Sequence, residues 1–261
     1  MKKSAFWWDI DESLVPLEYH NFPKEADFVV VGGGFTGLSA GLAIARRGHS
    51  VIVLDGGNPG FGASTRNGGI CSGNVRLSHG LISKKYGETF ADEVYAEAIE
   101  ARLDLTKFCE EVSINCELQM TGRFTGALSV ADYDTQGYEA ERLNKVKGHK
   151  AYMVDRKDQH SEIATDLFHG GMVREEIGGF HPAKFFVGLL RCAEKAGVCV
   201  FSNTTVIDIN NELNGKKSII TKIGTIISGQ VITATNAYTG TRYRVGRFLR
   251  KRLVPLPKVQ L

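Results

Sequence analysis

The sequence of 261 residues is poor in cysteine, and its few cysteines are scattered. The five cysteines form no C-x-x-C pair and no zinc-ligand spacing, so we expect no metal site. An odd number of dispersed cysteines is typical of a protein in a reducing compartment. We therefore expect a cytoplasmic location.

The sequence also lacks a long apolar run without glycine. Residues 28–45 carry no charge, but five glycines interrupt them and their periodicity changes from strand to helix. We therefore expect no membrane span. Lys2 and Lys3 resemble the start of a signal peptide, but acidic residues from Asp9 onward interrupt the short apolar stretch, so no signal peptide is expected.

A basic face is missing as well. The formal net charge of +3 comes from one cluster of arginines and a lysine between residues 242 and 252, and the remainder of the chain is net acidic. Nucleic-acid binding requires basic residues across a whole face of a domain. We therefore expect no nucleic-acid partner. The sequence contains no internal repeat and no low-complexity segment.

Glycine is abundant, and three spaced glycines form the most informative motif. Residues 28–31 predict a buried strand, and Gly32, Gly34 and Gly37 lead into a helix predicted over 35–47. In this motif the first glycine permits a tight turn, the second lets backbone amides approach a diphosphate, and the third lets the helix pack closely on the strand. The helix N-terminus then adds partial positive charge.

An acidic residue completes this pattern. Asp55 follows the next apolar run, 51–54, where a carboxylate can accept hydrogen bonds from a ribose diol and repel a 2′-phosphate. The alternative is a glycine turn without a ligand. Because strand, helix and acid all have the spacing that the mechanism needs, we favour a dinucleotide site.

A second glycine-rich segment, 60–69, follows Asp55. Ser64 can offer a hydroxyl to phosphate, Arg66 can add positive charge, and Gly68 and Gly69 permit close approach of the backbone to a flat ring. Taken alone, such a segment is more often a flexible loop. Its place directly after Asp55 favours a role along an extended ligand.

The other segments read as alternating helices and strands. The patterns predict a loop over 56–73, amphipathic helices over 77–112 and 131–147, a strand or hairpin over 116–130, a helix over 183–195, and strands over 198–201, 204–209 and 231–235, with hairpin turns at Gly215 and Gly224. Residues 254–261 resemble a strand that is only starting. His20 and His79 are expected at the surface.

Several motifs together resemble one known family, the D-amino-acid oxidase-like FAD-dependent amine oxidoreductases. The likeness is greatest to the gamma-glutamylputrescine oxidoreductase branch, with glycine and sarcosine oxidases as relatives. It covers nearly the whole chain and is carried by residues 6–9, 32–40, 46–51, 60–64, 66–69, 179–184 and 234–239.

The resemblance implies an α/β fold. A Rossmann-like FAD-binding domain with a three-layer β/β/α arrangement is expected, together with an incomplete antiparallel-sheet substrate domain. The implied organisation is an N-terminal arm over 1–25, FAD-binding segments over 26–92 and 171–240, a helical and strand segment over 93–170 that contributes to the substrate domain, and the start of a truncated substrate domain over 241–261.

The resemblance also implies noncovalent FAD, since no histidine matches a position of covalent flavin attachment. The cofactor-binding residues that it implies are Gly32, Gly34, Phe35, Thr36, Gly37, Asp55, Ala63, Ser64, Arg66, Asn67, Gly68, Gly69, Val206, Thr235 and Asn236. Two positions depart from the family pattern. Asp55 replaces the usual, longer Glu, and Thr65 stands where the branch has Gly, so Thr65 is expected to be strained if that position needs a positive φ.

Family members oxidise the C–N bond of an amine or amino acid by hydride transfer to flavin, and water then hydrolyses the imine. We name no catalytic residue, because a neutral amine needs no general base. His181 and Pro182 are better explained as a turn and a first helical proline than as catalytic residues.

The relatives are longer, and the part absent here supplies more of their substrate sheet and closes over the flavin ring. Two hypotheses follow: an FAD-dependent amine or amino-acid oxidoreductase, with a second polypeptide as a partner that would supply the remaining half, or a catalytically incompetent FAD- or ADP-binding fragment. An NAD-dependent dehydrogenase is weaker, because residues 63–69 would have no role in it.

Overall fold

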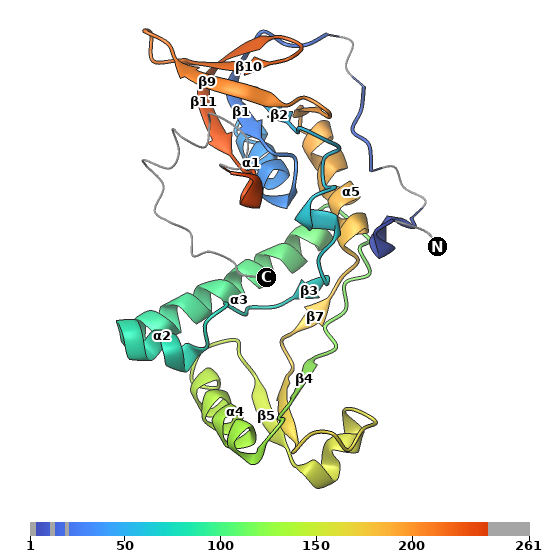
Figure 1. The fold of residues 1–261 in the computed structure, drawn as a ribbon, viewed down its shortest axis with the longest axis vertical. Coiled ribbons are helices and arrows are strands. Elements are labelled where there is room, and N and C mark those ends of the chain that lie inside the picture. Colours follow the sequence, from blue (N-terminus) through green and yellow to red (C-terminus); the bar gives the residue numbers. More distant parts are fainter. Residues whose placement is uncertain (1–3, 11–13, 19–20, 240–261) are drawn as a thin grey trace. The chain divides into compact units, whose positions relative to one another are not determined.

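The structure, a computed structural model, describes residues 4–10, 14–18 and 21–239. The described residues form two compact units. The first comprises those up to Asn67 and from Pro182 onward, and the second is Gly68–His181. Figure 1 shows the ribbon. The basic cluster of residues 242–252, the final strand expected over 254–261 and His20 lie outside the described residues. The domain boundaries expected from the sequence stay predictions.

A six-stranded mixed sheet organises the first unit (Figure 1). Strands β8, β2, β1 and β11 are parallel, and β10 and β9 continue the sheet antiparallel beside β11. Their bounds are β1 Glu25–Val31, β2 Val51–Leu54, β8 Cys199–Phe201, β9 Val206–Asn211, β10 Lys217–Thr221 and β11 Thr225–Thr233. Val31 pairs with both Leu54 and Thr233. The residues that follow these three strands therefore leave the sheet along one edge.

Alternation along the strands separates two buried faces. On one face, the side chains of β1 and β2 form a core with side chains from the antiparallel strands, comprising Val29, Ile52, Leu54, Val206, Ile219 and Ile226. On the other face, helix α1 (Phe35–Ala45) packs on β1 and β2, and α5 (Pro182–Lys195) packs on α1. This confirms the predicted α/β class and its β/β/α layers.

The second unit combines small antiparallel sheets with helices. Strands β4 (Arg123–Gly126), β6 (Gly171–Arg174) and β5 (Ala151–Val154) form a three-stranded sheet on which α4 (Val130–Leu143) packs (Figure 1). A two-stranded pair, β3 (Ile70–Cys71) and β7 (Gly178–Gly179), and the packed helices α2 (His79–Tyr86) and α3 (Glu88–Glu111) complete it. Short 3-10 turns occur at Phe6–Trp8, Ala63–Thr65, Arg156–Ser161 and Asn236–Tyr238.

Some sequence predictions in this unit are wrong. The helix predicted over 77–112 is two helices, because Gly87 has a φ of 97° and ends α2. The strand predicted over 116–130 is restricted to Arg123–Gly126, and the 56–73 loop contains β3. His79 is not at the surface: it is 1% exposed, and its Nε2 lies 2.6 Å from Asp92 Oδ1.

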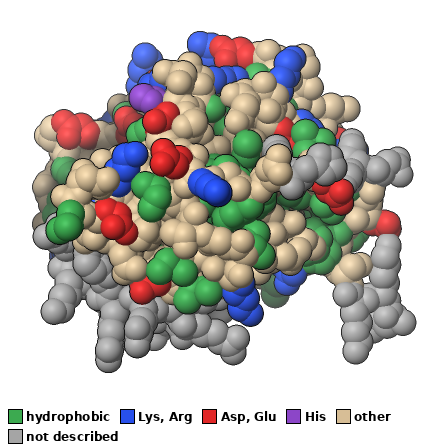
Figure 2. All heavy atoms as spheres, turned by 90° about the horizontal axis from the view of Figure 1, so that it is seen from above, with side chains coloured by type: hydrophobic (Ala, Val, Ile, Leu, Met, Phe, Trp, Pro, Cys, Tyr) green, Lys and Arg blue, Asp and Glu red, His purple; other side chains and the backbone are tan. Residues whose placement is uncertain are grey.

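Charged side chains of both signs are intermixed on the face drawn in Figure 2. Among the residues that the structure describes, no helix is long and apolar enough to cross a membrane. Within those same residues, no group of three or more His, Cys, Asp or Glu side chains is arranged to hold a metal ion.

Candidate dinucleotide-binding site

The turn after β1 depends on two glycines at positions where a side chain would clash with the backbone. Gly32 has a φ of +107°, and a Cβ there would lie 2.5 Å from the carbonyl oxygen of Ala234. Its N–H donates to the Leu54 carbonyl at 2.8 Å. At Gly37, a Cβ would lie 1.8 Å from the Gly32 carbonyl oxygen, which is far inside van der Waals contact. These two glycines therefore set the tight turn and the close helix–strand packing that the motif predicts.

The N-terminus of α1 faces the second glycine-rich segment. Gly34 is the N-cap residue and so has no capping side chain, and the first turn of the helix holds no acid. The Phe35 N–H donates to Ser64 Oγ at 3.0 Å, and a Cβ on Gly34 would lie 2.8 Å from the same oxygen. The positive end of this helix is thus partnered by a neutral hydroxyl, an arrangement that suits an anion such as a diphosphate.

Asp55 follows β2 and is held by backbone amides. Its Oδ2 accepts a hydrogen bond from the Gly33 N–H at 2.8 Å, and its Oδ1 accepts one from the Gly57 N–H at 2.9 Å. The Asp55 carbonyl accepts from the Thr204 N–H at 2.7 Å. Because each carboxylate oxygen has two lone pairs, one acceptor position on each remains for a ligand. The contact with ribose stays a prediction.

The segment after Asp55 is ordered by its own hydrogen bonds. Asn67 Nδ2 donates to the carbonyls of Ala63 and Ser64, at 3.2 and 2.8 Å. The Thr65 hydroxyl is buried and donates to the Gly60 carbonyl at 2.7 Å. The strain expected at Thr65 is not found, since Thr65 is absent from the residues with positive φ within the described ranges. The Thr65 side chain instead stabilises the segment through its hydrogen bond to Gly60.

The N-terminal aromatic residues pack on this same loop. Trp8 Nε1 donates to Thr65 Oγ1 at 2.8 Å, and the Trp8 ring stacks on Phe61 with centroids 4.3 Å apart. The Arg66 guanidinium lies 4.6 Å from the centroid of the Trp8 ring. Trp7 Nε1 donates to the Asn67 carbonyl at 2.8 Å. The sequence predicted an N-terminal arm but not this role. The available signals were the adjacent Trp7 and Trp8 in that arm and the unusual Thr65 in the glycine-rich segment.

The other predicted site residues have different surroundings. Val206 is buried in the core shared by the two strand layers. A Cβ added to Gly32 would lie 3.3 Å from the Thr235 backbone nitrogen, so these two residues are neighbours. Asn236 has a φ of 47°. Gly68 and Gly69 belong to the second unit, where the Gly69 carbonyl accepts from the Phe180 N–H at 2.8 Å.

Residues of the first unit therefore converge at the carboxyl edge of the parallel strands. Gly32, Gly34, Phe35, Asp55 and Ser64 are joined by the contacts above, and Thr235 adjoins Gly32. Ligands of open α/β sheets bind at this edge.

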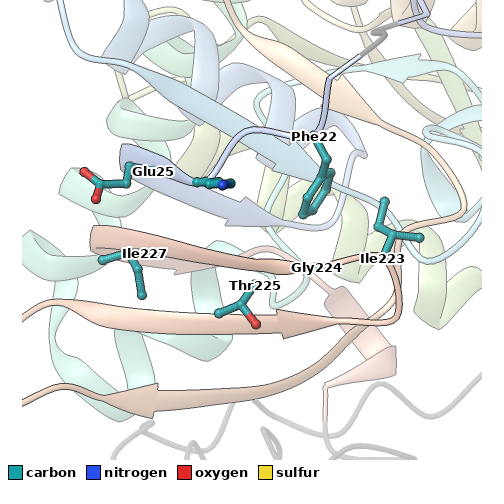
Figure 3. A pocket seen from close by; sticks show the side chains of 7 residues that line it. Phe22, Glu25, Ile223, Gly224, Thr225 and Ile227 are labelled. Carbon is teal, nitrogen blue, oxygen red and sulfur yellow. The ribbon is translucent and has the colours of Figure 1, made fainter.

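A separate hollow opens at the other end of the same strands (Figure 3). It is lined by Phe22, Lys24, Glu25, Ile223, Gly224, Thr225 and Ile227. Glu25 and Ile227 lie at the start of their strands, whereas the glycine turn follows the strand ends. The hollow is thus distinct from the dinucleotide site.

In the second unit, a buried ionic network ties β6 to its surroundings. Arg174 Nε donates to Glu176 Oε1 at 2.8 Å, and His149 Nδ1 lies 2.9 Å from the same oxygen. Arg174 also donates to the Asn74 side chain. Burial raises the pKa of Glu176, but the hydrogen bonds from His149 and Arg174 outweigh it and lower this pKa to about 2.

The family comparison agrees with this geometry. Residues 27–260 match the family model DAO, described as FAD dependent oxidoreductase. The chain belongs to this family. The match includes the glycine turn, Asp55, the segment 63–69 and the later residues Val206, Thr235 and Asn236. FAD is the cofactor of the family.

Curated relatives extend beyond the chain. It is 32% identical over 216 residues to the probable oxidoreductase OrdL of Haemophilus influenzae, which covers 82% of this chain and 50% of that protein. It is 28% identical over 252 residues to the gamma-glutamylputrescine oxidoreductase of Escherichia coli, covering 97% of this chain and 58% of that protein. The chain therefore spans about half the length of the curated relatives it matches.

Solved structures agree on the fold. The glycine oxidase of Geobacillus kaustophilus superposes with a TM-score of 0.75 at 21% identity, over 87% of this chain and 59% of that one. At this identity, the similarity shows the shared fold alone.

Proposed function

We propose that the chain binds FAD noncovalently and forms all or part of an oxidoreductase that acts on the C–N bond of an amine or amino acid. The observation that carries the proposal is the convergence of the α1 N-terminus, the Gly32 turn and Asp55 at one edge of the sheet. The family match supports FAD as the dinucleotide. The names of the relatives support an amine-type substrate.

The residues present suit the ADP half of FAD. Backbone amides at the start of α1 would hold the diphosphate, with Ser64 Oγ, 3.0 Å from the Phe35 nitrogen, as a further hydroxyl partner. Asp55 would accept from the adenosine ribose through its remaining lone pairs. Thr235 and Asn236 would flank the dinucleotide where β11 ends, and the Val206 backbone would meet the adenine.

When bound, FAD supplies a flavin that accepts the hydride, and water then hydrolyses the imine product. The chain's contribution is binding and orientation. Ala63, Ser64, Arg66 and Asn67 would line the ligand beyond the diphosphate, held by the Thr65–Gly60 and Trp8–Thr65 hydrogen bonds. Gly68 and Gly69 would offer backbone to the ring. We assign no catalytic residue.

One substitution tests the binding site directly. Gly34→Val would place a branched side chain between the α1 N-terminus and Ser64, where even a Cβ lies 2.8 Å from Ser64 Oγ. We expect purified Gly34→Val to lose the flavin absorption that the unsubstituted chain shows after reconstitution with FAD. Retention of flavin by this variant would contradict the assignment.

A control outside the site separates binding from folding. Gly137→Ala, in α4 of the second unit, adds a Cβ that meets nothing within 4 Å, so this variant should retain flavin. Both variants should keep the far-ultraviolet circular dichroism of the parent chain.

A second experiment separates an oxidoreductase from a fragment that only binds FAD. The flavin-loaded chain is mixed anaerobically with a panel of amines and amino acids, alone and with a polypeptide that corresponds to the remaining half of the relatives. Bleaching of the flavin spectrum supports oxidoreductase function. An unchanged spectrum under both conditions supports the alternative, an FAD- or ADP-binding fragment without turnover.

A further inference from the structure

Two buried cysteines face each other in the second unit. Cys109 lies in the last turn of α3, and Cys116 lies in the segment that follows the helix. Their sulfur atoms are 3.9 Å apart, and the residues are 5% and 1% exposed. Both are free thiols in the structure.

The backbone holds this pair in place. Ser113 and Glu117 have φ values of 56° and 55°, so the chain reverses sharply after α3. The Ile114 N–H donates to the Cys109 carbonyl at 2.8 Å, and the Cys116 carbonyl accepts from the His181 N–H at 2.7 Å. Hydrogen bonds therefore fix the backbone at both cysteines, and the two sulfurs meet because the reversal brings them together.

The two thiols are not equivalent. Either sulfur can donate across the 3.9 Å contact; with Cys109 as the donor, the contact lowers the pKa of Cys116 and raises that of Cys109. The backbone N–H of Leu118 adds to the lowering at Cys116 and acts against the effect of burial. A thiolate is the reactive form of cysteine, so the lowered pKa favours Cys116 as the attacking thiol, and the 3.9 Å contact places Cys109 to resolve its oxidised form. Because Cys116 is 1% exposed, peroxide must reach it through local opening of the structure.

We propose that Cys109 and Cys116 form a peroxide-sensitive modification site, which oxidises to an intramolecular disulfide. The Cys116 thiolate attacks one oxygen of hydrogen peroxide; the O–O bond breaks, Cys116 becomes a sulfenic acid and, after protonation of the departing hydroxide, one water forms. The Cys109 sulfur then attacks the Cys116 sulfur, the S–O bond breaks, and a second water leaves with the Cys109 proton. Two thiols lose two electrons in total, and one peroxide is reduced to two waters.

The required movement is small. The sulfurs, 3.9 Å apart, must approach by roughly 2 Å to reach the bonding distance of about 2.05 Å. A third thiol lies nearby: burial raises the pKa of Cys71 in β3, and the charge of Cys116 raises it further. Cys71 is therefore the competing partner that an experiment must distinguish.

The test uses the full chain, reduced and then freed of reductant. The chain is treated with hydrogen peroxide, its remaining thiols are blocked with N-ethylmaleimide, and its peptides are mapped without reduction. We expect linked peptides that contain Cys109 and Cys116, with the other three of the five cysteines alkylated. Dithiothreitol should restore both thiols.

Two variants sharpen the assignment. Cys109→Ser should abolish the disulfide and leave Cys116 as a sulfenic acid that a cyclic dione reagent traps. Cys192→Ser, which alters a partly exposed thiol elsewhere, should leave the disulfide unchanged. A merely structural pair would show neither the disulfide nor the trapped sulfenic acid.

The map of the unsubstituted chain decides the question even if a variant fails to fold. A disulfide that joins Cys71 to Cys116 would overturn the proposal. So would five alkylated thiols after peroxide treatment, or oxidation confined to Cys192 and Cys199. None of these outcomes depends on FAD binding, so this proposal stands or falls independently of the proposed function.

Discussion

The two units treat a carboxylate in opposite ways. In the first unit, Asp55 accepts hydrogen bonds from the backbone amides of Gly33 and Gly57, at the edge of a sheet where the first turn of α1 carries no acidic residue. In the second, Glu176 is enclosed by the side chains of Arg174 and His149. The first arrangement leaves acceptors and amides for a ligand, whereas the second satisfies its charges internally. The proposed binding site thus differs from the structural ion network because it keeps hydrogen-bonding groups available for a ligand.

The strongest way to break this comparison is to disrupt the backbone of the first unit. Gly37→Val places atoms where a Cβ already lies 1.8 Å from the Gly32 carbonyl oxygen, and backbone cannot yield as a side chain would. Because overpacking typically costs about 1–3 kcal/mol and more where nothing can move, we expect a loss above about 3 kcal/mol in urea unfolding.

The control for this substitution is Gly62→Ala, whose added Cβ meets nothing within 4 Å. Its unfolding midpoint should equal that of the parent chain. Equal stability of Gly37→Val and Gly62→Ala would mean that the close contact between α1 and the turn is not required.

The next largest effect concerns the network of the second unit. Glu176→Gln keeps the shape of the side chain but leaves the Arg174 cation buried without its anion, and breaking a buried pair in this way costs about 3–5 kcal/mol. The neighbouring Glu175→Gln removes only a surface pair with Lys150, with nitrogen and oxygen 3.9 Å apart, and should change stability by less than about 1 kcal/mol.

Acid sharpens the same test. The pKa of Glu176 is lowered from 4.5 to about 2, so its ionised form stabilises the fold above about pH 4.5, and this contribution is lost as the pH falls toward 2. Glu176→Gln should lack this component of the acid-dependent loss. A parent chain and variant whose stabilities fall in parallel between these pH values would contradict the role assigned to the network.

The smallest predicted effect lies on the aromatic arm. Trp8→Phe retains a ring to stack on Phe61 but loses the N–H that donates to Thr65 Oγ1. We expect a loss of about 1 kcal/mol, typical of one hydrogen bond, together with weaker FAD binding measured by fluorescence titration. A double-mutant cycle with Thr65→Val should show coupling, whereas Phe6→Leu, at a residue that is 83% exposed, should show none with Thr65→Val.

The sequence predicted those parts of the site that depend on local backbone geometry. Position 32 has a positive φ, and position 37 lies too close to the Gly32 carbonyl for a side chain to fit. Both positions therefore require glycine, and this requirement is visible in the sequence. The helix over 35–47 and the first helical proline at Pro182 were confirmed by α1 and α5 for the same reason. The α/β class followed from the order of these elements.

What the sequence did not predict depends on partners far apart in the chain. Arg174 and Asn74 are one hundred positions apart, and Trp8 and Thr65 are separated by 57. The burial of His79 depends on Asp92 and on the fold around it, and the Cys109–Cys116 pair depends on a reversal that no helical or strand periodicity encodes. Pairings of this kind are fixed by tertiary structure and leave no fixed spacing in the sequence.

The position of the two indoles has a practical consequence. Trp7 and Trp8 are the only tryptophans of the chain, and both donate to residues of the segment 63–67. Tryptophan emission from this protein therefore originates in one small region. Quenching of that emission by energy transfer to an added flavin would report occupancy of the proposed dinucleotide site without any engineered label.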